Sequence, residues 1–168
     1  MLQGSFAMHG PEILLRNARE SDVAALTLLL MQTYRETWAP MLRPEAAAAF
    51  DSGERTKAYV QGHWREFTVA VPGVDDGRIV GMVHVEGDFI DALHVAPSQQ
   101  RRGIGALLLA QAESRMRAQG HPLARLETDT FNVQSRAFYA RHGYAEVAMY
   151  PDEEWDSGFT TVLLTKAL

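Results

Sequence analysis

The chain has 168 residues, of which 46% are hydrophobic, and it carries a formal net charge of −5 at pH 7. This length supports one sizeable hydrophobic core and is short for two, so we expect a single globular domain over residues 1–168. The acidic balance provides no basic surface for nucleic acid, and the absence of cysteine excludes a disulfide framework, a thiolate metal site and a cysteine nucleophile.

The sequence carries no signal for membrane insertion or secretion. No apolar run approaches the roughly 18 residues of a membrane-spanning helix, and the N-terminus lacks a basic stretch followed by an apolar one. We therefore expect a cytoplasmic protein with no membrane partner and no nucleic-acid partner. Residues 1–10 show no periodicity, and we expect a disordered or tag-derived leader there.

The N-terminal half begins with a strand and continues with helices. Residues 12–17 predict the strand, and Asp22 ends a polar run that can cap an amphipathic helix. Two prolines then interrupt the helical pattern. Residues 45–60 predict a further helical stretch that is interrupted at Gly53.

The remaining chain is rich in strands, and glycine-containing turns separate the first of them into an antiparallel meander. The helix expected at residues 103–119 makes the strand that follows it a plausible parallel partner of the strand that precedes it. A short helix at 132–142 ends at Gly143. In chain order, the predicted strands are residues 12–17, 67–71, 78–86, 89–95, 124–129, 144–150 and 159–167.

The stretch from Phe89 to Gly120 reads as strand, glycine-bearing loop and helix in one unit. Gly103 and Gly105 lie at the start of the helix, where free N–H groups and the helix dipole favour an anion. Two arginines precede them, so the local chemistry indicates a phosphate-bearing ligand. The simpler interpretation is a tight strand-to-helix connection with solvated arginines. The helix itself is amphipathic, and Glu113 falls away from its apolar face.

Two nucleotide-binding motifs are alternative interpretations of this stretch. A dinucleotide fingerprint requires a third glycine, where this chain has Leu108, and requires the glycines to follow the strand directly. Glu127 and Asp129 on the next predicted strand keep that alternative open. A mononucleotide P-loop fits less well, because no Lys-Ser or Lys-Thr pair follows the glycines.

The spacing of Gln100, Gly103 and Gly105 resembles the acetyl-CoA signature of the GNAT acetyltransferase superfamily, Gln/Arg-x-x-Gly-x-Gly/Ala. The preceding strand of that family ends hydrophobic-x-Val-x-Pro, which residues 93–97 match. The strand, loop, motif and helix agree in order and spacing with the family.

A second motif lies on the helix at residues 132–142. Polar side chains recur there at Asn132, Ser135, Tyr139 and His142, and periodicity alone favours a solvent-facing stripe. The same helix resembles the second GNAT motif, Asn-x-x-Ala/Ser-x-x-aromatic-Tyr followed by Gly-aromatic. The matching residues are Asn132, Ser135, Phe138, Tyr139, Gly143 and Tyr144.

The resemblance implies an α/β (α+β) fold with a central, mixed and mostly antiparallel sheet of about seven strands flanked by helices. It also implies an N-acetyltransferase that moves the acetyl group of acetyl-CoA to a primary amine of a small molecule or peptide, by direct transfer in a ternary complex. A homodimer is common in the family. The implied cofactor-binding residues are Leu93, His94, Val95, Gln100, Arg101, Arg102, Gly103, Ile104, Gly105, Ala106, Asn132, Ser135 and Tyr139.

The catalytic residues follow from the same resemblance. Tyr139 is the candidate acid, because a phenol is protonated at pH 7 and can donate to the departing thiolate. Many family members carry the basic carboxylate where this chain has Phe89. The titratable residues nearby in the sequence are His84, Glu86, Asp88, Asp91 and His94. We rank Glu86 first and His84 second as the candidate base, and strand alternation places both on one face. Alternation also places Asp91 and His94 on opposite faces.

We expect no metal, because a set of His84, Glu86 and His94 has no spacing that fixes a third ligand. Two alternatives to an acetyltransferase remain: a non-catalytic CoA-binding regulatory module, and a nucleotide- or NAD-binding enzyme. For the acceptor, we expect a cationic amine that meets an acidic cluster in the last hairpin, against the simpler interpretation of a solvated hairpin tip. The cluster consists of Asp152, Glu153, Glu154 and Asp156, with Trp155 among them.

Overall fold

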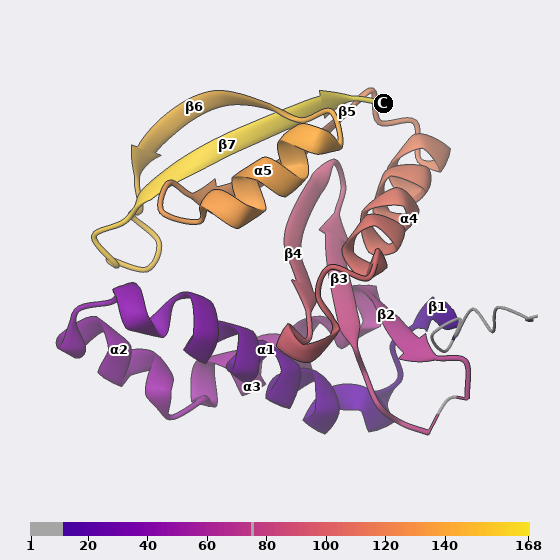
Figure 1. Cartoon of the computed structure of the whole chain (residues 1–168), viewed down its shortest axis with the longest axis horizontal. Coiled ribbons are helices and arrows are strands. Elements are labelled where there is room, and N and C mark those ends of the chain that lie inside the picture. Colours follow the sequence, from indigo (N-terminus) through magenta and orange to yellow (C-terminus); the bar gives the residue numbers. More distant parts are fainter. Residues whose placement is uncertain (1–11, 75) are drawn as a thin grey trace, which may run out of the picture.

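A seven-stranded mixed sheet runs through the computed structural model in the order β1-β2-β3-β4-β5-β7-β6 (Figure 1). The structure describes residues 12–74 and 76–168, so the leader expected at 1–10 lies outside the described residues. β4 and β5 are parallel, and the other described pairs are antiparallel, as expected. The strands are β1 (Ile13–Asn17), β2 (Phe67–Pro72), β3 (Gly81–Glu86), β4 (Phe89–Val95), β5 (Leu123–Asp129), β6 (Ala145–Pro151) and β7 (Thr160–Ala167).

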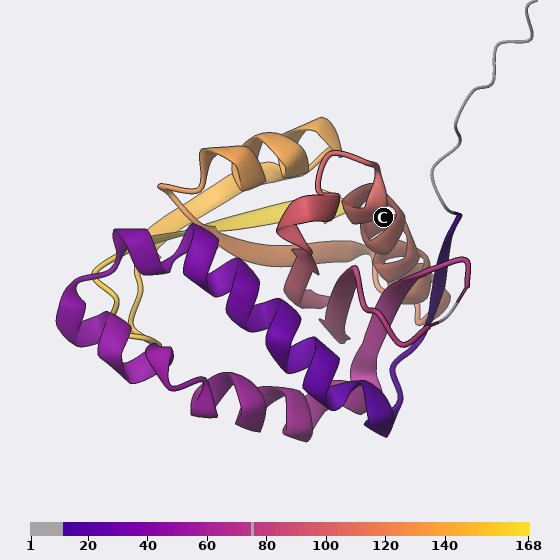
Figure 2. The same ribbon diagram turned by 60° about the horizontal axis from the view of Figure 1, so that its bottom comes forward.

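Helices cover both faces of the sheet. α1, α2 and α3 lie together along one side of the molecule, and α4 and α5 lie on the other (Figures 1 and 2). Gly53, with φ of +74°, separates α2 from α3 at the predicted interruption. The α-helices are α1 (Val23–Thr37), α2 (Pro44–Asp51), α3 (Glu54–His63), α4 (Ile104–Ala118) and α5 (Val133–Arg141).

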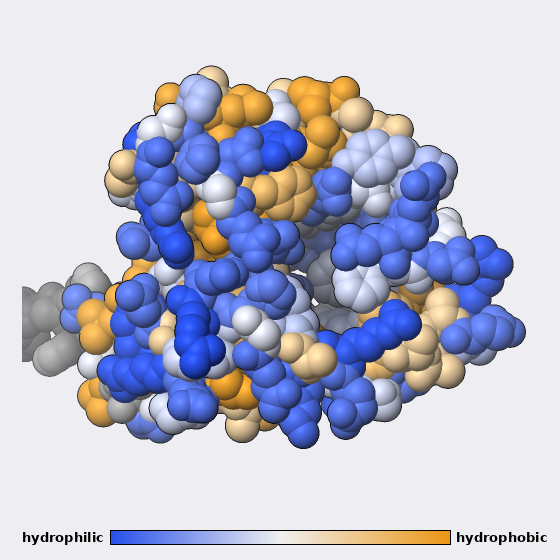
Figure 3. All heavy atoms as spheres, turned by 180° about the vertical axis from the view of Figure 1, so that it is seen from behind, coloured by the Kyte–Doolittle hydropathy of each residue, from blue (hydrophilic) through white to orange (hydrophobic). Residues whose placement is uncertain are grey.

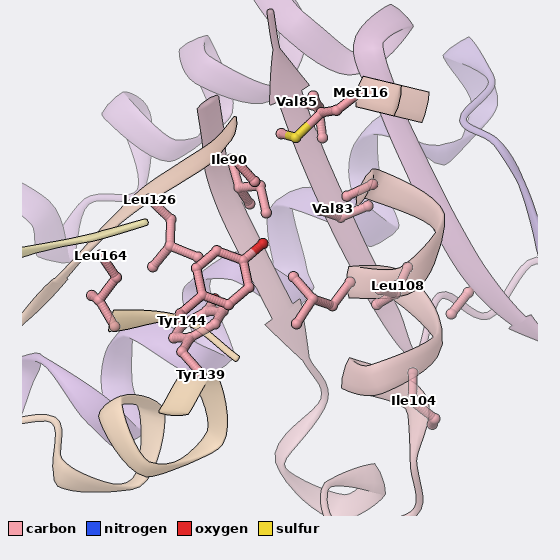
Figure 4. Packing of buried hydrophobic residues seen from close by; sticks show 14 of the residues in the cluster. Val83, Val85, Ile90, Ile104, Leu108, Met116, Leu126, Tyr139, Tyr144 and Leu164 are labelled. Carbon is pink, nitrogen blue, oxygen red and sulfur yellow. The ribbon is translucent and has the colours of Figure 1, made fainter. Parts of the chain in front are cut away.

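Two hydrophobic clusters fill the space between the helices and the sheet. β3 contributes to both, because its successive side chains alternate between the faces. Val83 and Val85 pack with α4, as Figure 4 shows, while Met82 packs with Leu26 and Leu29 of α1. This two-sided burial explains why residues 81–85 of β3 are all buried, with no alternation between buried and exposed positions.

The sheet divides where β4 meets β5. Their register contains Phe89 with Arg125 and Ile90 with Leu126 and then stops, whereas β5 pairs with β7 from Leu123 through Asp129. A register shift between β3 and β4 leaves Asp91 as an additional residue just beyond this point. Since a bulge bends its strand, β4 turns away from β5, and Figure 1 shows the two halves of the sheet diverging.

Glu113 on α4 is buried, which corrects the expectation that it lies on a polar face. Its carboxylate accepts hydrogen bonds from Lys166 Nζ at 2.9 Å to each oxygen and from the Tyr144 hydroxyl at 3.2 Å. Since buried charges require a partner, this ion pair connects α4 to β7 in the other half of the sheet. Sequence periodicity could not reveal it, because Lys166 lies far along the chain.

Asp22 is buried at the start of α1 and is held by two parallel bonds. Arg16 donates to its two carboxylate oxygens at 2.7 and 3.0 Å, and the backbone N–H of Arg19 donates at 2.7 Å. Burial alone would raise the pKa of Asp22, but these donors outweigh it and hold the pKa below its usual value.

We predict that Asp22→Asn lowers the free energy of unfolding by about 2 kcal/mol at pH 7, because it removes the charge of a buried carboxylate that accepts hydrogen bonds from Arg16 and from the Arg19 backbone. The depressed pKa makes this contribution fully present above the ordinary carboxyl pKa, and it is lost progressively as the pH falls from that value through the lower pKa of the folded state. Urea unfolding at pH 7 and pH 3 should therefore give a large difference and then a smaller one. Asp76→Asn, which removes an exposed pair with Arg78, is the control and should change little. An equal loss at both pH values would contradict the prediction.

Candidate active site

The diverging edge of β4 presents backbone donors that β5 does not reach. The N–H of Ala96 donates to Val80 on the β3 side at 2.8 Å. Because successive N–H groups of a strand point in opposite directions, those of Leu93 and Val95 point toward the β5 side. The described pairing of β4 with β5 ends before these residues, at Ile90. Two fixed donors thus line the gap between the strands, and the N–H of His94 points toward β3.

The loop between β4 and α4 has the geometry of an anion site. Gln100 donates through Nε2 to the carbonyl of Val95 at 3.2 Å, which ties the loop to the end of β4. Arg101 and Gly103 have φ of +62° and +83°, so the chain turns sharply before the helix begins. Arg101, Arg102 and Gly103 are exposed. The first turn of α4, which includes Ile104, Gly105 and Ala106, presents its free N–H groups at the same place.

Gly105 brings the two sequence motifs into contact. A Cβ atom placed on it would lie 3.4 Å from Phe138 Cζ of α5 and 3.7 Å from Val95 Cγ2 of β4. The start of α4 therefore packs closely against α5. Ile104 has a buried side chain in the adjoining core, so its backbone alone is available to a ligand.

The helix α5 differs from the solvent-facing stripe that periodicity favoured. Tyr139 is 6% exposed, whereas Val133, which an apolar face would bury, is 69% exposed. The Asn132 side chain accepts a hydrogen bond from the Ser135 backbone at 3.2 Å and so caps the helix. Asn132 and Ser135 thus shape the first turn of α5.

Tyr139 lies in the core between the two halves of the sheet. Figure 4 places Tyr139 and Tyr144 together among Ile90, Leu126 and Leu108. No residue in the described part of the chain hydrogen-bonds its hydroxyl, yet no fully enclosed side-chain polar atom there lacks a partner, so the hydroxyl reaches solvent. Burial raises the pKa of Tyr139, which keeps the phenol protonated at neutral pH.

The two candidate bases lie together, and the fold adds two residues that the sequence interpretation missed. His84 is 1% exposed, and its Nε2 lies 2.7 Å from Glu66 Oε2 and 3.5 Å from Glu86 Oε1. His63 Nδ1 lies 3.5 Å from Glu66 and 3.4 Å from Glu86. The signal in the sequence was the i, i+3 spacing of His63 and Glu66 at the end of a helix, which is weak by itself.

The predicted position of Asp91 near this cluster is corrected. The additional residue in β4 breaks the strand alternation, and the Asp91 carboxyl lies within electrostatic range of His84 and Glu86. Burial chiefly raises the pKa of Asp91, and Glu86 raises it further while His84 lowers it. His94 lies elsewhere, with Nδ1 2.8 Å from Thr33 Oγ1 on α1. The set of His84, Glu86 and His94 considered for a metal is therefore not assembled.

His94 begins a chain of contacts that crosses the gap on the α1 side. Burial lowers the pKa of His94 to about 4, so its ring is neutral at pH 7. The ring lies 6.0 Å from that of Trp38, whose Nε1 donates to Asp129 Oδ2 on β5 at 2.8 Å. Burial raises the pKa of Asp129, although the bond from Trp38 acts in the opposite direction. The sequence indicates a role for Asp129 only in the dinucleotide-binding alternative.

A cavity of about 380 Å³ lies between α2 and the loop that joins β6 to β7. The Phe50 and Trp155 rings, whose centroids lie 5.5 Å apart, pack on each other in its wall. Asp152 accepts bonds from the backbone of Glu154, Trp155 and Ser157, so it shapes the loop instead of facing the cavity. The lining residues are Arg43, Glu45, Ala46, Ala49, Phe50, Arg55, Trp155 and Asp156. Figure 3 shows the surface hollowed between the two halves of the molecule.

Comparison with known proteins identifies the family of this chain. The model of the acetyltransferase (GNAT) family matches residues 28–144. The chain belongs to the GNAT acetyltransferase family. The match includes β4, the glycine loop, α4 and α5, so both motifs of the GNAT resemblance lie inside it.

Relatives of this GNAT protein include characterised acetyltransferases. Blasticidin-S acetyltransferase of Streptomyces morookaense is 28% identical over 143 residues, which cover 85% of this chain and 99% of that protein. The peptidyl-lysine N-acetyltransferase YiaC of Escherichia coli is 37% identical over 71 residues, which cover 42% of this chain and 45% of that protein. The PaiA N-acetyltransferase of Thermoplasma acidophilum, solved with coenzyme A, has a TM-score of 0.74 at 18% identity, over 94% of this chain and 99% of that chain.

These findings confirm the expected GNAT fold and an acetyl-CoA-dependent N-acetyltransferase. The backbone donors of β4 and the first turn of α4 fit an extended thioester with a pyrophosphate at one end. A dinucleotide-binding enzyme is disfavoured, because its doubly wound sheet is parallel and this sheet is mostly antiparallel. Among the described residues, no helix is both long and apolar enough to cross a membrane.

We predict that Gly103→Ala weakens acetyl-CoA binding by about tenfold or more, because an alanine resists the left-handed backbone that orients the phosphate loop. Gly120→Ala is a matched control at the other end of α4. Both glycines have φ of +83° with no atom within 4 Å of an added Cβ. Each variant should lose about 1 kcal/mol of stability, but calorimetry should detect weaker binding in Gly103→Ala alone. Equal affinities in the two variants would contradict this assignment.

Proposed function

We propose that this protein transfers the acetyl group of acetyl-CoA to a primary amine of a small molecule, by direct attack within a ternary complex. The observation that carries the proposal is the Tyr139 hydroxyl, which is held between the sheet halves with no hydrogen bond to the described residues and with access to solvent. Acetyl-CoA supplies an activated thioester, and the residues below would orient it and manage the protons.

The backbone of β4 would bind the thioester end. The N–H groups of Leu93 and Val95 point toward the β5 side, where they can stabilise negative charge on the carbonyl oxygen. Such donors are fixed by the strand before the reaction begins, so they need no reorganisation. The first turn of α4, with Arg101 and Arg102 beside it, would bind the pyrophosphate. His94 would contribute to this site by packing against α1, because its N–H points toward β3 and cannot bind the thioester.

Tyr139 would act as the general acid. Its raised pKa keeps the phenol protonated at neutral pH, so the hydroxyl can donate a hydrogen bond to the sulfur atom as the bond between carbon and sulfur breaks. The hydroxyl is not committed to another residue of the described chain, so it is free to donate. The aromatic rings of Phe138 and Tyr144 pack at its sides and fix its direction.

Glu86 and His84 would accept the proton from the attacking amine. Glu86 is half exposed, so it can pass a proton to solvent. His84 is buried, and its Nε2 lies 3.5 Å from Glu86 Oε1. An alkylammonium must lose a proton before it attacks, and a water molecule can extend the reach of either group. We rank Glu86 first because it combines a carboxylate with access to solvent.

The acceptor side favours a small molecule over an extended peptide. α2 contacts the β6–β7 loop, where Phe50 packs on Trp155 and the Arg43 guanidinium lies 2.6 Å from a Cβ placed on Gly158. This contact closes one end of the gap between the sheet halves. The full-length similarity to blasticidin-S acetyltransferase is consistent with a small acceptor. The expected homodimer and cytoplasmic location stay predictions.

The charges around the cavity refine the expected cationic amine. Glu45 and Asp156 can receive an ammonium group, and Phe50 and Trp155 offer aromatic faces to it. Arg43 and Arg55 line the same cavity, and neither forms an ion pair within the described residues. An acceptor with an anionic group beside its amine therefore fits better than a polycation.

We predict that Tyr139→Phe lowers kcat by about 100-fold while the KM for acetyl-CoA changes little, because the phenol acts on the leaving group and not on binding. The assay is thiol release with a panel of small amines. Tyr144→Phe is the control, since its hydroxyl binds Glu113 and should affect stability more than turnover. A normal kcat in Tyr139→Phe would rule out the acid role.

We predict that Asp156→Asn raises the KM for the acceptor about tenfold with little change for acetyl-CoA, because Asp156 lines the cavity. Glu153→Gln is the control, because Glu153 is exposed and does not line that cavity. Asp152 is avoided because it holds the loop together. An unchanged acceptor KM in Asp156→Asn would argue against binding in this cavity.

A further inference from the structure

A group of four side chains, which we call the His–Glu cluster, joins three elements of the fold. It consists of His63, Glu66, His84 and Glu86. His63 ends α3, Glu66 ends the short 3₁₀ helix Trp64–Glu66, and the other two residues lie on β3. Each contributes one nitrogen or oxygen atom, and these four atoms all lie within 4.8 Å of one another.

The distances within the His–Glu cluster approach those of a tetrahedral metal site. Ligand atoms at about 2.0–2.1 Å from a zinc ion in tetrahedral geometry are separated by roughly 3.3–3.4 Å. The observed separations are 3.5 Å for His63 to Glu66, 3.4 Å for His63 to Glu86 and 3.5 Å for His84 to Glu86. The fourth, His84 to Glu66, is a 2.7 Å hydrogen bond that would open by less than 1 Å.

The donor atoms indicate which kind of ion fits. Two imidazole nitrogens and two carboxylate oxygens suit zinc and related divalent transition metals. Calcium and magnesium favour sites made of oxygen alone. Four protein ligands also form a closed site, which is the structural type.

His84 is oriented in advance for this role. Its ring is 1% exposed and packs on the Phe67 ring at 4.9 Å between centroids. The Tyr59 hydroxyl lies 2.6 Å from Nδ1 and can accept a hydrogen bond from Nδ1–H, which leaves the lone pair of Nε2 directed at the His–Glu cluster. Metal-binding histidines commonly have such a partner on the second nitrogen.

The local charge also favours a divalent cation. Glu66, Glu86 and Asp91 influence one another electrostatically in this small region. The positive groups that face them are the two histidines, when protonated, and Arg115 of α4, which donates to the backbone carbonyl of Glu66 at 3.3 Å. With neutral histidines, the carboxylates carry a negative charge that a divalent ion would balance.

We propose that the His–Glu cluster binds one divalent transition-metal ion of the zinc class and thereby fastens α3 and the adjoining 3₁₀ helix to β3. The site is distinct from the acetyl-CoA site, and its existence does not depend on the proposed function. An ion bound there would occupy the lone pairs of His84 and Glu86. Bound zinc should therefore inhibit acetyl transfer if these residues serve as the base.

The test is a titration of the full-length, metal-free protein with Zn²⁺ in competition with a chromophoric chelator. We expect one equivalent to bind, and we expect His63→Ala to weaken binding by about 100-fold or more, because it removes a ligand. His63 is partly exposed, so this variant should fold. His121→Ala is the control, since His121 lies outside the His–Glu cluster and should leave the affinity unchanged.

Two further measurements separate a built site from loose surface binding. Zn²⁺ at a large excess over Kd should raise Tm by about 5 °C in the wild type and not in His63→Ala. Tyr59→Phe, which leaves all four ligands in place, should weaken binding by about tenfold because it removes the partner of Nδ1. Absence of stoichiometric binding, or equal affinity in the wild type and His63→Ala, would overturn the proposal. All of these readouts are independent of acetyltransferase activity.

Discussion

The parallel ladder between β4 and β5 contains two residue pairs, Phe89 with Arg125 and Ile90 with Leu126, and the proposed acetyl-CoA site depends on its being that short. Every backbone group of a continuous ladder would be paired within the sheet. Since the strands separate, β4 keeps donors that face the gap, and a thioester can lie where the next strand would otherwise continue. The bulge at Asp91 bends β4 at this point.

The divergence also explains why so many contacts join the two halves from outside the sheet. α4 packs on β3 and β4 and reaches β7 through the buried pair of Glu113 and Lys166. α1 reaches β5 through the bond from Trp38 to Asp129. These contacts lie on opposite faces of the sheet, so they connect the two halves on either side of the gap.

Local chemistry made much of this architecture predictable from the sequence. The strand β4 was predicted at its observed bounds, and α4 within one residue at each end, because Pro97 and Gly103 have strong backbone preferences. All seven strands were anticipated in the same way. The spacing of the two motifs then indicated the family, which the family match confirms.

The features that escaped the sequence interpretation depend on contacts between distant segments or on broken periodicity. His63 ends α3 and Glu66 directly precedes β2. They reach His84 only because β2 pairs with β3 in the sheet. Asp91 was assigned to the wrong face because alternation assumes a strand without a bulge. Glu113 was assigned to solvent because its partner lies at the end of the chain. None of these can be read from a window of neighbouring residues.

Gly81 on β3 shows how closely the cofactor-binding elements are spaced. A methyl group there would lie 2.9 Å from Leu108 of α4 and 3.1 Å from the carbonyl oxygen of His94, so little more than a hydrogen atom fits between helix and sheet. This contact sets the distance from the helix end, where a pyrophosphate would bind, to the β4 donors, where a thioester carbonyl would bind. In the proposed binding mode, this spacing would determine which length of cofactor arm can reach from the pyrophosphate to the thioester carbonyl.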